Sequence, residues 1–402
     1  MNQVDGGICA PRGYQAAGVA ARIKGPQSAK KDCALLVSGA PASVAGTFTT
    51  NVVKAAPVLW CQEVCRKGRA RAVFINSGNA NACTGERGAQ DARETARRVA
   101  GGLNIPEEEV LIASTGVIGV PLPMERVMQG VDGCLAAISP AGNGDAARAI
   151  MTTDTVPKET AVEVALAQGV VRVGAMVKGA GMIAPNMATM ICVITTDAAI
   201  AAKDLQAVLR ASVEQSFNRI CVDNDMSTND TVLCLANGQA GLPALEPGAP
   251  DYESFADALR HVCRHMAQAL VRDGEGATKF VEVRVEGARG DGDARAIARS
   301  IAMSQLCKTA FNGSDPNWGR IACAAGYAGV AFDPARLDIW VGDLQVLTHG
   351  LPAVYEEAAA AERMRGRDIA LRVSVGDGPG TCTYWTSDLS KEYVSINADY
   401  RS

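Results

Sequence analysis

The stretch of sequence best suited to chemistry runs from Lys178 to Ile191, where a glycine-rich, proline-containing loop leads directly into an apolar strand. A strained loop of this kind can hold the Ala188 carbonyl against the Thr189 hydroxyl, which allows an N-to-O acyl shift followed by hydrolysis of the ester. Threonine also forms strands well, so a packing role is the alternative for this position. The chemical hypothesis predicts that the chain cuts itself between Ala188 and Thr189 and leaves Thr189 as a new N-terminus.

Histidine is scarce in this chain. With three histidines in total, a Ser-His-Asp or Cys-His mechanism has few possible bases, which favours a nucleophile with another kind of base. His261 and His265 are spaced four residues apart on a predicted helix, but Val262 stands where the zincin pattern requires glutamate. We therefore predict no metal site, and we expect His261, Cys263 and His265 to lie at or near the surface.

Residues 179–184 match the GxGxxA fingerprint of dinucleotide-binding proteins and follow a predicted strand. Such a site needs these glycines to open a helix whose N-terminus meets the pyrophosphate. Here Pro185 and a second strand-like run follow instead. No loop marks a phosphate-binding site for coenzyme A either, so the sequence predicts no bound cofactor.

Composition and charge exclude several classes of protein. The 402 residues are 48% hydrophobic and 20% charged, as expected of a folded soluble protein of about two to three domains. The net charge of -4 disfavours a nucleic-acid partner, and no apolar run approaches the roughly 18 residues of a membrane span. Residues 1–7 have no apolar signal core, so we expect a cytoplasmic protein. Its 13 cysteines are expected to be reduced and buried, as at Cys192, Cys234 and Cys323.

Hydrophobic patterning predicts a mixed α/β fold. Apolar spacing indicates two amphipathic helices around residues 205–213 and 255–266, with Asp251 as the N-cap of the second and Asp273 at its end. Residues 238–250 are expected to form a loop. Seven short runs rich in β-branched residues predict strands: 72–76, 110–114, 170–178, 190–196, 231–236, 279–285 and 369–375.

Nine motifs distributed over nearly the whole chain occur in a fixed order. They are 18–21 (GVAA), 43–51 (SVAGTFTTN), 76–82 (NSGNANA), 113–119 (ASTGVIG), 151–155 (MTTDT), 178–190, 273–279 (DGEGATK), 315–320 (DPNWGR) and 396–402 (INADYRS). In these motifs the chain resembles the ornithine acetyltransferase family, the bifunctional glutamate N-acetyltransferases of arginine biosynthesis. The resemblance implies an N-terminal-nucleophile-like α/β sandwich of sheets and helices, with a smaller second domain in the C-terminal half.

The resemblance also implies the cut between Ala188 and Thr189. It would give an α segment of residues 1–188 and a β segment of residues 189–402, which together build one main domain and assemble as an α2β2 heterotetramer. The freed α-amino group of Thr189 has a reference pKa of about 7.7 to 8.0, so it can accept the proton of its own hydroxyl near neutral pH. No histidine base is then required.

Roles for individual residues follow from the same resemblance. It assigns the oxyanion hole to Thr115 and Gly116, which without that context form an ordinary strand-ending turn. The position of Thr152 is open to a shift, because Thr153 and Thr155 are close in sequence. The implied substrate contacts are Thr152, Lys178, Thr189, Glu275, Asn397 and Ser402.

The implied reaction is ping-pong transfer of an acetyl group from N2-acetylornithine to glutamate through an acetyl ester of Thr189. Whether acetyl-CoA is a second donor is left open. Two other interpretations remain: a hydrolase or aminopeptidase in which water replaces the amine, and an uncut protein that only binds acetylated amino acids. Cys221, Asn224 and Met226 depart from the residues that relatives usually carry, which leaves acceptor specificity less certain.

Overall fold

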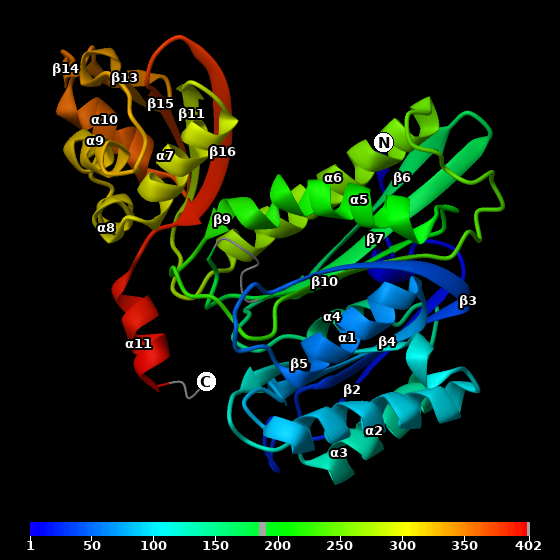
Figure 1. Cartoon of the computed structure of the whole chain (residues 1–402). Coiled ribbons are helices and arrows are strands. Elements are labelled where there is room, and N and C mark those ends of the chain that lie inside the picture. The colour runs from blue at the N-terminus through cyan, green and yellow to red at the C-terminus, as the bar shows by residue number, and fades with distance from the viewer. Residues whose placement is uncertain (185–189, 400–402) are drawn as a thin grey trace.

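The computed structural model describes residues 1–184 and 190–399, which form two β-sheets flanked by helices (Figure 1). The larger sheet runs in the order β1-β6-β7-β8-β10-β3-β4-β5, and β2 pairs with β3 off this path. Its strands are β1 (Asn2–Gln3), β2 (Tyr14–Val19), β3 (Cys33–Phe48), β4 (Arg69–Asn79), β5 (Val110–Val117), β6 (Lys158–Leu166), β7 (Gly169–Lys178), β8 (Ile191–Thr196) and β10 (Thr231–Ala236).

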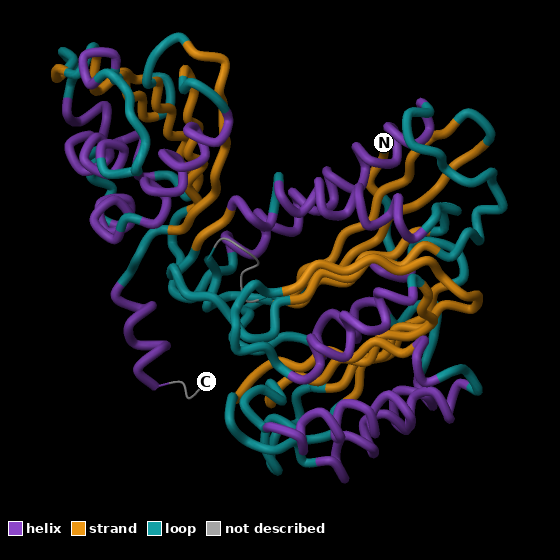
Figure 2. Tube along the Cα trace, in the orientation of Figure 1, coloured by secondary structure: helices purple, strands orange, loops and turns teal. Residues whose placement is uncertain are grey.

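Strand β3 belongs to two parts of this sheet. Residues 33–38 pair with β2 and β4, whereas residues 43–48 pair with β10. The register against β4 shifts between Val37 and Ala42, where glycine and proline interrupt the regular ladder. The sheet thus divides into a first leaf (β1, β6, β7, β8, β10 and the end of β3) and a second leaf (β2, the start of β3, β4 and β5), stacked one above the other (Figure 2).

Helices cover both outer faces of the two leaves and fill the space between them (Figure 1). Helices α5 and α6 lie on the first leaf, α2 and α3 lie on the second, and α1 and α4 lie between. The middle layer is apolar: Val64 of α1 packs in one buried cluster with Val73 and Leu233 from the two leaves. The bounds are α1 (Ala56–Lys67), α2 (Gly85–Leu103), α3 (Met124–Ala137), α4 (Asn143–Ala149), α5 (Ala202–Glu214) and α6 (Pro250–Arg272).

The C-terminal half builds a smaller second unit, as expected, around the sheet β14-β13-β12-β15-β11-β16-β9. This unit has its own core, and Figure 1 shows it set apart from the stacked leaves. Its strands are β9 (Ile220–Cys221), β11 (Phe280–Gly287), β12 (Asp338–Val341), β13 (Leu344–Thr348), β14 (Leu351–Pro352), β15 (Asp368–Ser374) and β16 (Gly378–Ser387). The helices after β11 are α7 (Asp291–Met303), α8 (Gln305–Asn312), α9 (Trp318–Gly326), α10 (Glu357–Arg365) and α11 (Lys391–Asp399), and short 3-10 helices occupy Gly7–Cys9, Glu107–Glu109, Phe217–Arg219 and Pro334–Arg336.

The seven predicted strands and the two predicted helices are confirmed. The predicted cap of α6 is wrong: the helix begins at Pro250, which suits the first helical position, and Asp251 instead accepts a hydrogen bond from the backbone N–H of Ala167 at 2.9 Å. Among the described helices, none is both long and apolar enough to cross a membrane.

Two expectations about thiols are also wrong. Cys192 and Cys234 are buried as expected, but Cys323 is exposed because its side of α9 turns away from the second core. Conversely, Cys263 is fully buried rather than near the surface, because α6 directs it toward the first leaf, while His261 and His265 are exposed.

Candidate active site

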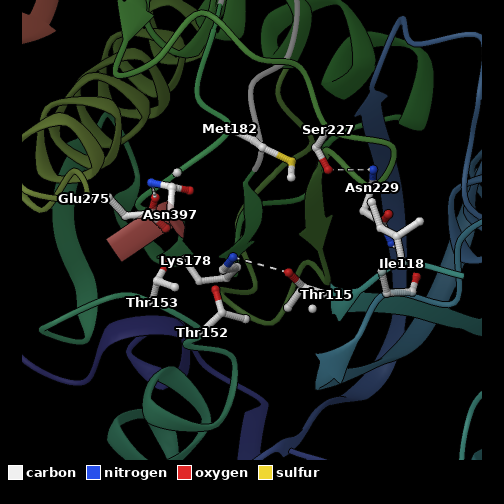
Figure 3. Close-up of a pocket in the computed structure, with 13 residues that line it drawn as sticks. Thr115, Ile118, Thr152, Thr153, Lys178, Met182, Ser227, Asn229, Glu275 and Asn397 are labelled. Atoms are coloured by element: carbon white, nitrogen blue, oxygen red, sulfur yellow. Dashed lines mark hydrogen bonds between the residues drawn. The ribbon is translucent and has the colours of Figure 1, made fainter. Parts of the chain in front are cut away.

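One pocket gathers residues from strand ends and loops that are far apart in the sequence (Figure 3). The first leaf supplies Lys178 at the end of β7, the second leaf supplies Thr115 at the end of β5, and α11 supplies Asn397. The space between these residues, with its open mouth included, is about 570 Å³. It is lined by Ala80, Thr115, Gly116, Ile118, Thr152, Thr153, Lys178, Gly181, Met182, Ser227, Asn229, Glu275 and Asn397.

The structure brings six of the predicted site residues to this pocket: Thr115, Gly116, Thr152, Lys178, Glu275 and Asn397. Thr153 also lines it, whereas Thr155 is exposed and its hydroxyl bonds to Asp273 outside the lining. The remaining predicted residues, Ala188, Thr189 and Ser402, lie outside the described residues. The roles assigned to all of these side chains stay predictions.

The predicted oxyanion strand is held in an unusual backbone conformation. Gly116 has φ +130°, and a Cβ at this position would collide with the backbone of Gly78 on β4. Only glycine suits both conditions, because side chains rarely adopt this φ and the neighbouring strand leaves no space. Two residues earlier in β5, the Ser114 hydroxyl donates a hydrogen bond to Asn76 Oδ1 at 2.6 Å, which ties β5 to β4.

Asn229 fixes the same strand from the other side. Its amide nitrogen donates to the carbonyl oxygens of Ala80 at 2.6 Å and of Ser114 at 2.8 Å. Because Ser114 directly precedes Thr115, this buried amide sets the position of the oxyanion strand against the residues that follow β4. Sequence analysis missed Asn229, and the only signal was its place among several polar residues just before an apolar strand.

Lys178 is a buried cation at the floor of the pocket. Its Nζ lies 3.3 Å from Thr115 Oγ1, and its side chain is almost fully buried. Burial lowers the pKa of Lys178, while the negative charge of Asp154 acts in the opposite direction. An ammonium has no acceptor, so it donates to the threonine oxygen and leaves the hydroxyl proton of Thr115 available to an acceptor in the pocket.

A buried ionic cluster supports this lysine from behind. Asp154 accepts hydrogen bonds from Lys158 Nζ at 2.6 Å and from the backbone N–H groups of Gly179 at 2.7 Å and Thr152 at 2.9 Å. Lys158 also lies 2.5 Å from Asp273 Oδ2. Burial acts to raise the pKa of Asp154, but Lys178, Lys158 and these hydrogen bonds outweigh it and hold the pKa at about 2.

The opposite wall carries a negative charge. Glu275 follows α6, and its carboxylate accepts a hydrogen bond from Asn397 Nδ2 at 2.8 Å. The backbone N–H of Glu275 donates to the Ala180 carbonyl at 2.8 Å, which ties this wall to the loop after β7. At Gly181 a Cβ would collide with the Glu275 carboxylate, so glycine allows the loop to pass this close.

Two further carboxylates hold the chain on either side of the undescribed residues 185–189. Asp223 accepts from the backbone N–H groups of Met182 at 2.6 Å and Ile183 at 2.7 Å, and burial raises its pKa to about 6. Asp230 accepts from the N–H of Met190 at 3.0 Å, while its Oδ2 is buried with no partner among the residues that the structure describes. Burial raises the pKa of Asp230 well above the ordinary range.

This arrangement suits acyl transfer on a small zwitterionic substrate. Lys178 matches a carboxylate, Glu275 matches an ammonium, and the hydroxyl of Thr115 with the backbone around Gly116 can meet an oxyanion. Within residues 1–184 and 190–399, no group of three or more histidine, cysteine, aspartate or glutamate side chains is arranged to hold a metal ion.

Comparison with known proteins decides the family, because the ArgJ family model matches residues 15–402. The chain belongs to the ArgJ family. Its ArgJ relatives include the arginine biosynthesis bifunctional protein ArgJ of Symbiobacterium thermophilum, which is 51% identical over 402 residues and matches over the full length of both chains. The chain is an enzyme of this family.

Two solved ArgJ-family structures are also similar. The crystal structure of the arginine biosynthesis bifunctional protein ArgJ from Bacillus halodurans is 42% identical with a TM-score of 0.50, and the match covers 51% of this chain and 97% of that chain. The ornithine acetyltransferase of Mycobacterium tuberculosis complexed with ornithine is 44% identical with a TM-score of 0.42, and its match covers 46% of this chain and 97% of that chain.

Proposed function

We propose that this ArgJ-family enzyme transfers an acetyl group from N2-acetylornithine to glutamate through an acetyl-threonine intermediate on Thr189. The observation that carries the proposal is that Lys178 and Glu275 line one pocket, in which Lys178 Nζ lies 3.3 Å from Thr115 Oγ1. Amino acids that carry a carboxylate and an amine fit such a pair. The relatives' name, arginine biosynthesis bifunctional protein, supports the same class of substrate.

The proposed chemistry has two half-reactions. The Thr189 hydroxyl oxygen attacks the acetyl carbonyl carbon and gives its proton to the α-amino group of the same residue, which then passes it to the departing amine of ornithine. The C–N bond breaks and an ester remains on Thr189. The amine of glutamate next attacks this ester, the C–O bond breaks, and N-acetylglutamate leaves as the threonine hydroxyl recovers a proton. Thr115 and Gly116 stabilise the oxyanion in both steps.

We also propose that the chain first cuts itself between Ala188 and Thr189, since only a free α-amino group at Thr189 can serve as that base. The half-length match in Bacillus halodurans supports a division, because almost all of that chain aligns with about half of this one. The segments 1–188 and 189–402 would then share one main domain. The same proposal includes acetyl-CoA as a second acetyl donor, an α2β2 assembly and a cytoplasmic location. The word bifunctional in the relatives' name supports the second donor.

The deciding experiment is the intact mass of the denatured protein, measured for the wild type and for Thr189→Ala. We expect two fragments that divide at residues 188 and 189 in the wild type and one full-length chain in the variant. A single chain in both proteins would overturn the mechanism and favour an uncut binding protein.

Transfer is tested separately, by supplying N2-acetylornithine with and without glutamate. We expect ornithine release that depends on glutamate and yields N-acetylglutamate in equal amount. Release of free acetate at the same rate with or without glutamate would make the protein a hydrolase.

A further inference from the structure

Among the residues that the structure describes, those that line the end of the pocket opposite Glu275 are uncharged. Ala80, Ile118, Met182 and Ser227 line it, and Figure 3 shows Ile118 and Ser227 on the same side of the pocket as Thr115, away from the Glu275–Asn397 pair. Glu275 stands at the other end, and Lys178 lies between the two ends, with its Nζ 3.3 Å from Thr115 Oγ1. The pocket is therefore polarised, and its two ends must recognise different parts of a substrate.

The uncharged end is built rigidly. The N–H of Ala80, which follows β4, donates to the carbonyl of Val117 at 2.9 Å. This hydrogen bond fixes the backbone next to Ile118. Asn229 bonds to the Ala80 carbonyl, and its own N–H donates to Ser227 Oγ at 3.0 Å. Ile118 packs from behind against a small buried cluster of Ala55, Val58, Ala80 and Ala82.

The geometry of a carbonyl group decides what this end can hold. Three substituents leave a trigonal carbon in directions about 120° apart. With the oxygen at Thr115 and Gly116 and the amino-acid portion directed to Lys178 and Glu275, the third substituent must enter the uncharged end. In an N-acyl amino acid that third substituent is the acyl chain.

We propose that the uncharged end, formed by Ala80, Ile118, Met182 and Ser227, is the subsite for the acyl group of the donor, and that Ile118 limits the length of that group. This inference rests on the proposed acyl transfer and adds a class of donor to it. Acetyl fits, and longer straight chains meet the Ile118 side chain. Acyl groups that end in a carboxylate are rejected, because the described side chains at this end offer no cation to compensate for burying the charge.

The test compares N2-acetyl-, N2-propionyl-, N2-butyryl- and N2-succinylornithine as donors to glutamate in the wild type and in Ile118→Ala. We expect the wild type to favour acetyl over butyryl by about 100-fold in kcat/KM, since each extra methylene is worth roughly 10-fold or more in a closed pocket. In Ile118→Ala we expect that ratio to fall by about 10-fold, while succinylornithine stays inactive in both proteins.

Thr153→Ala is the matched control, because Thr153 lines the charged end of the same pocket. It should change KM for every donor by a similar factor and leave the acetyl-to-butyryl ratio where it is. Intact mass after purification shows whether each variant has matured. If Ile118→Ala does not fold, Ile118→Val removes a single methylene and should move the ratio in the same direction by a smaller factor.

The outcomes separate this subsite from the reaction itself. Acetyl transfer by the wild type with an unchanged acetyl-to-butyryl ratio in the folded Ile118 variants would overturn the subsite and leave the proposed function intact. Succinyl transfer by the wild type at a rate near that of acetyl would also overturn it. No transfer from any donor by the mature wild type would overturn the proposed function.

Discussion

Behind the pocket, the ammonium of Lys158 lies 2.6 Å from Asp154 Oδ1, and both side chains are almost fully buried. The same carboxylate accepts the N–H of Gly179, next to Lys178, and the N–H of Thr152. One charged group therefore fixes two walls of the pocket and compensates two buried lysines. Without it, Lys178 would lose the carboxylate that opposes the effect of its burial, while Lys158 would keep Asp273 as its partner.

Asp154→Asn keeps the size of the side chain but removes its charge. We expect the variant to lose about 3–5 kcal/mol of unfolding free energy, because Lys178 is left buried without this counter-charge and Lys158 keeps only Asp273. Urea unfolding followed by circular dichroism measures the change. As a control, Asp377→Asn removes the exposed partner of Arg336 and should leave the midpoint unchanged. Equal midpoints for the wild type and Asp154→Asn would show that the cluster contributes nothing.

Lys178 gives the reaction a dependence on pH. Its pKa is lowered by burial, so the loss of its proton should end activity at a pH below that expected for an ordinary lysine. Asp154 opposes this shift, so Asp154→Asn should move the alkaline limb of kcat/KM to lower pH. Glu163→Gln, which alters a pair with Arg172 on β6 and β7, serves as the control. If the alkaline limb has the same pH midpoint in Asp154→Asn as in the wild type, the limb does not report the titration of Lys178.

Ionisation of Asp223 should lower the free energy of unfolding as the pH rises. Its pKa in the folded protein is about 6, above the value of about 3.9 in an unfolded chain, so the folded state binds the proton more tightly. Its contribution is fully present below pH 4 and is lost as the pH rises through 6. We expect the stability difference between the wild type and Asp223→Asn to shift by about 2 kcal/mol between pH 4 and pH 7, in favour of the variant at pH 7. A difference independent of pH would contradict the raised pKa.

Gly116→Ala tests the oxyanion strand. The added Cβ meets the backbone of Gly78 and the φ of +130° is unfavourable, so the strand must move away from its position beside Thr115. We expect kcat to fall about 100-fold or more, with the smaller change in KM. Gly119→Ala is the matched control, since Gly119 also has a positive φ of +79° but its Cβ would meet no atom within 4 Å. Similar losses in both variants would assign the effect to backbone strain alone.

Sequence patterning succeeded where strands are short, apolar and rich in β-branched residues, as in β8 and β10. It failed for β3, because residues 38–42 are small or proline and hide a strand that continues past its own bend. It also failed for α2, whose buried stripe combines alanines, such as Ala92 and Ala96, with Gly88, Asp91 and Thr95, and so gives a weak apolar signal.

The site shows the same limit more sharply. Lys178, Glu275 and Asn397 were predicted from a family resemblance, because nothing in their spacing indicates that they meet. Asp154 and Asn229 were missed, since Asn229 bonds to a carbonyl 115 residues away and Asp154 joins its near neighbours to Gly179, 25 residues away. Hydrogen-bond networks of this kind are properties of the folded chain and leave no local pattern.

The first leaf contains strands from both sides of the proposed cut, and this has a consequence for the order of folding and cleavage. Strands β8 and β10, which follow residues 188 and 189 in the chain, pair with each other and lie between β7 and β3, which precede those residues. If the chain is cut as proposed, folding must therefore precede scission. In the uncut chain the two halves find each other as parts of one molecule. Once they are separate, denatured halves would have to meet by diffusion, at a rate that depends on their concentration. The mature enzyme would then persist because it unfolds slowly, rather than because it can readily refold.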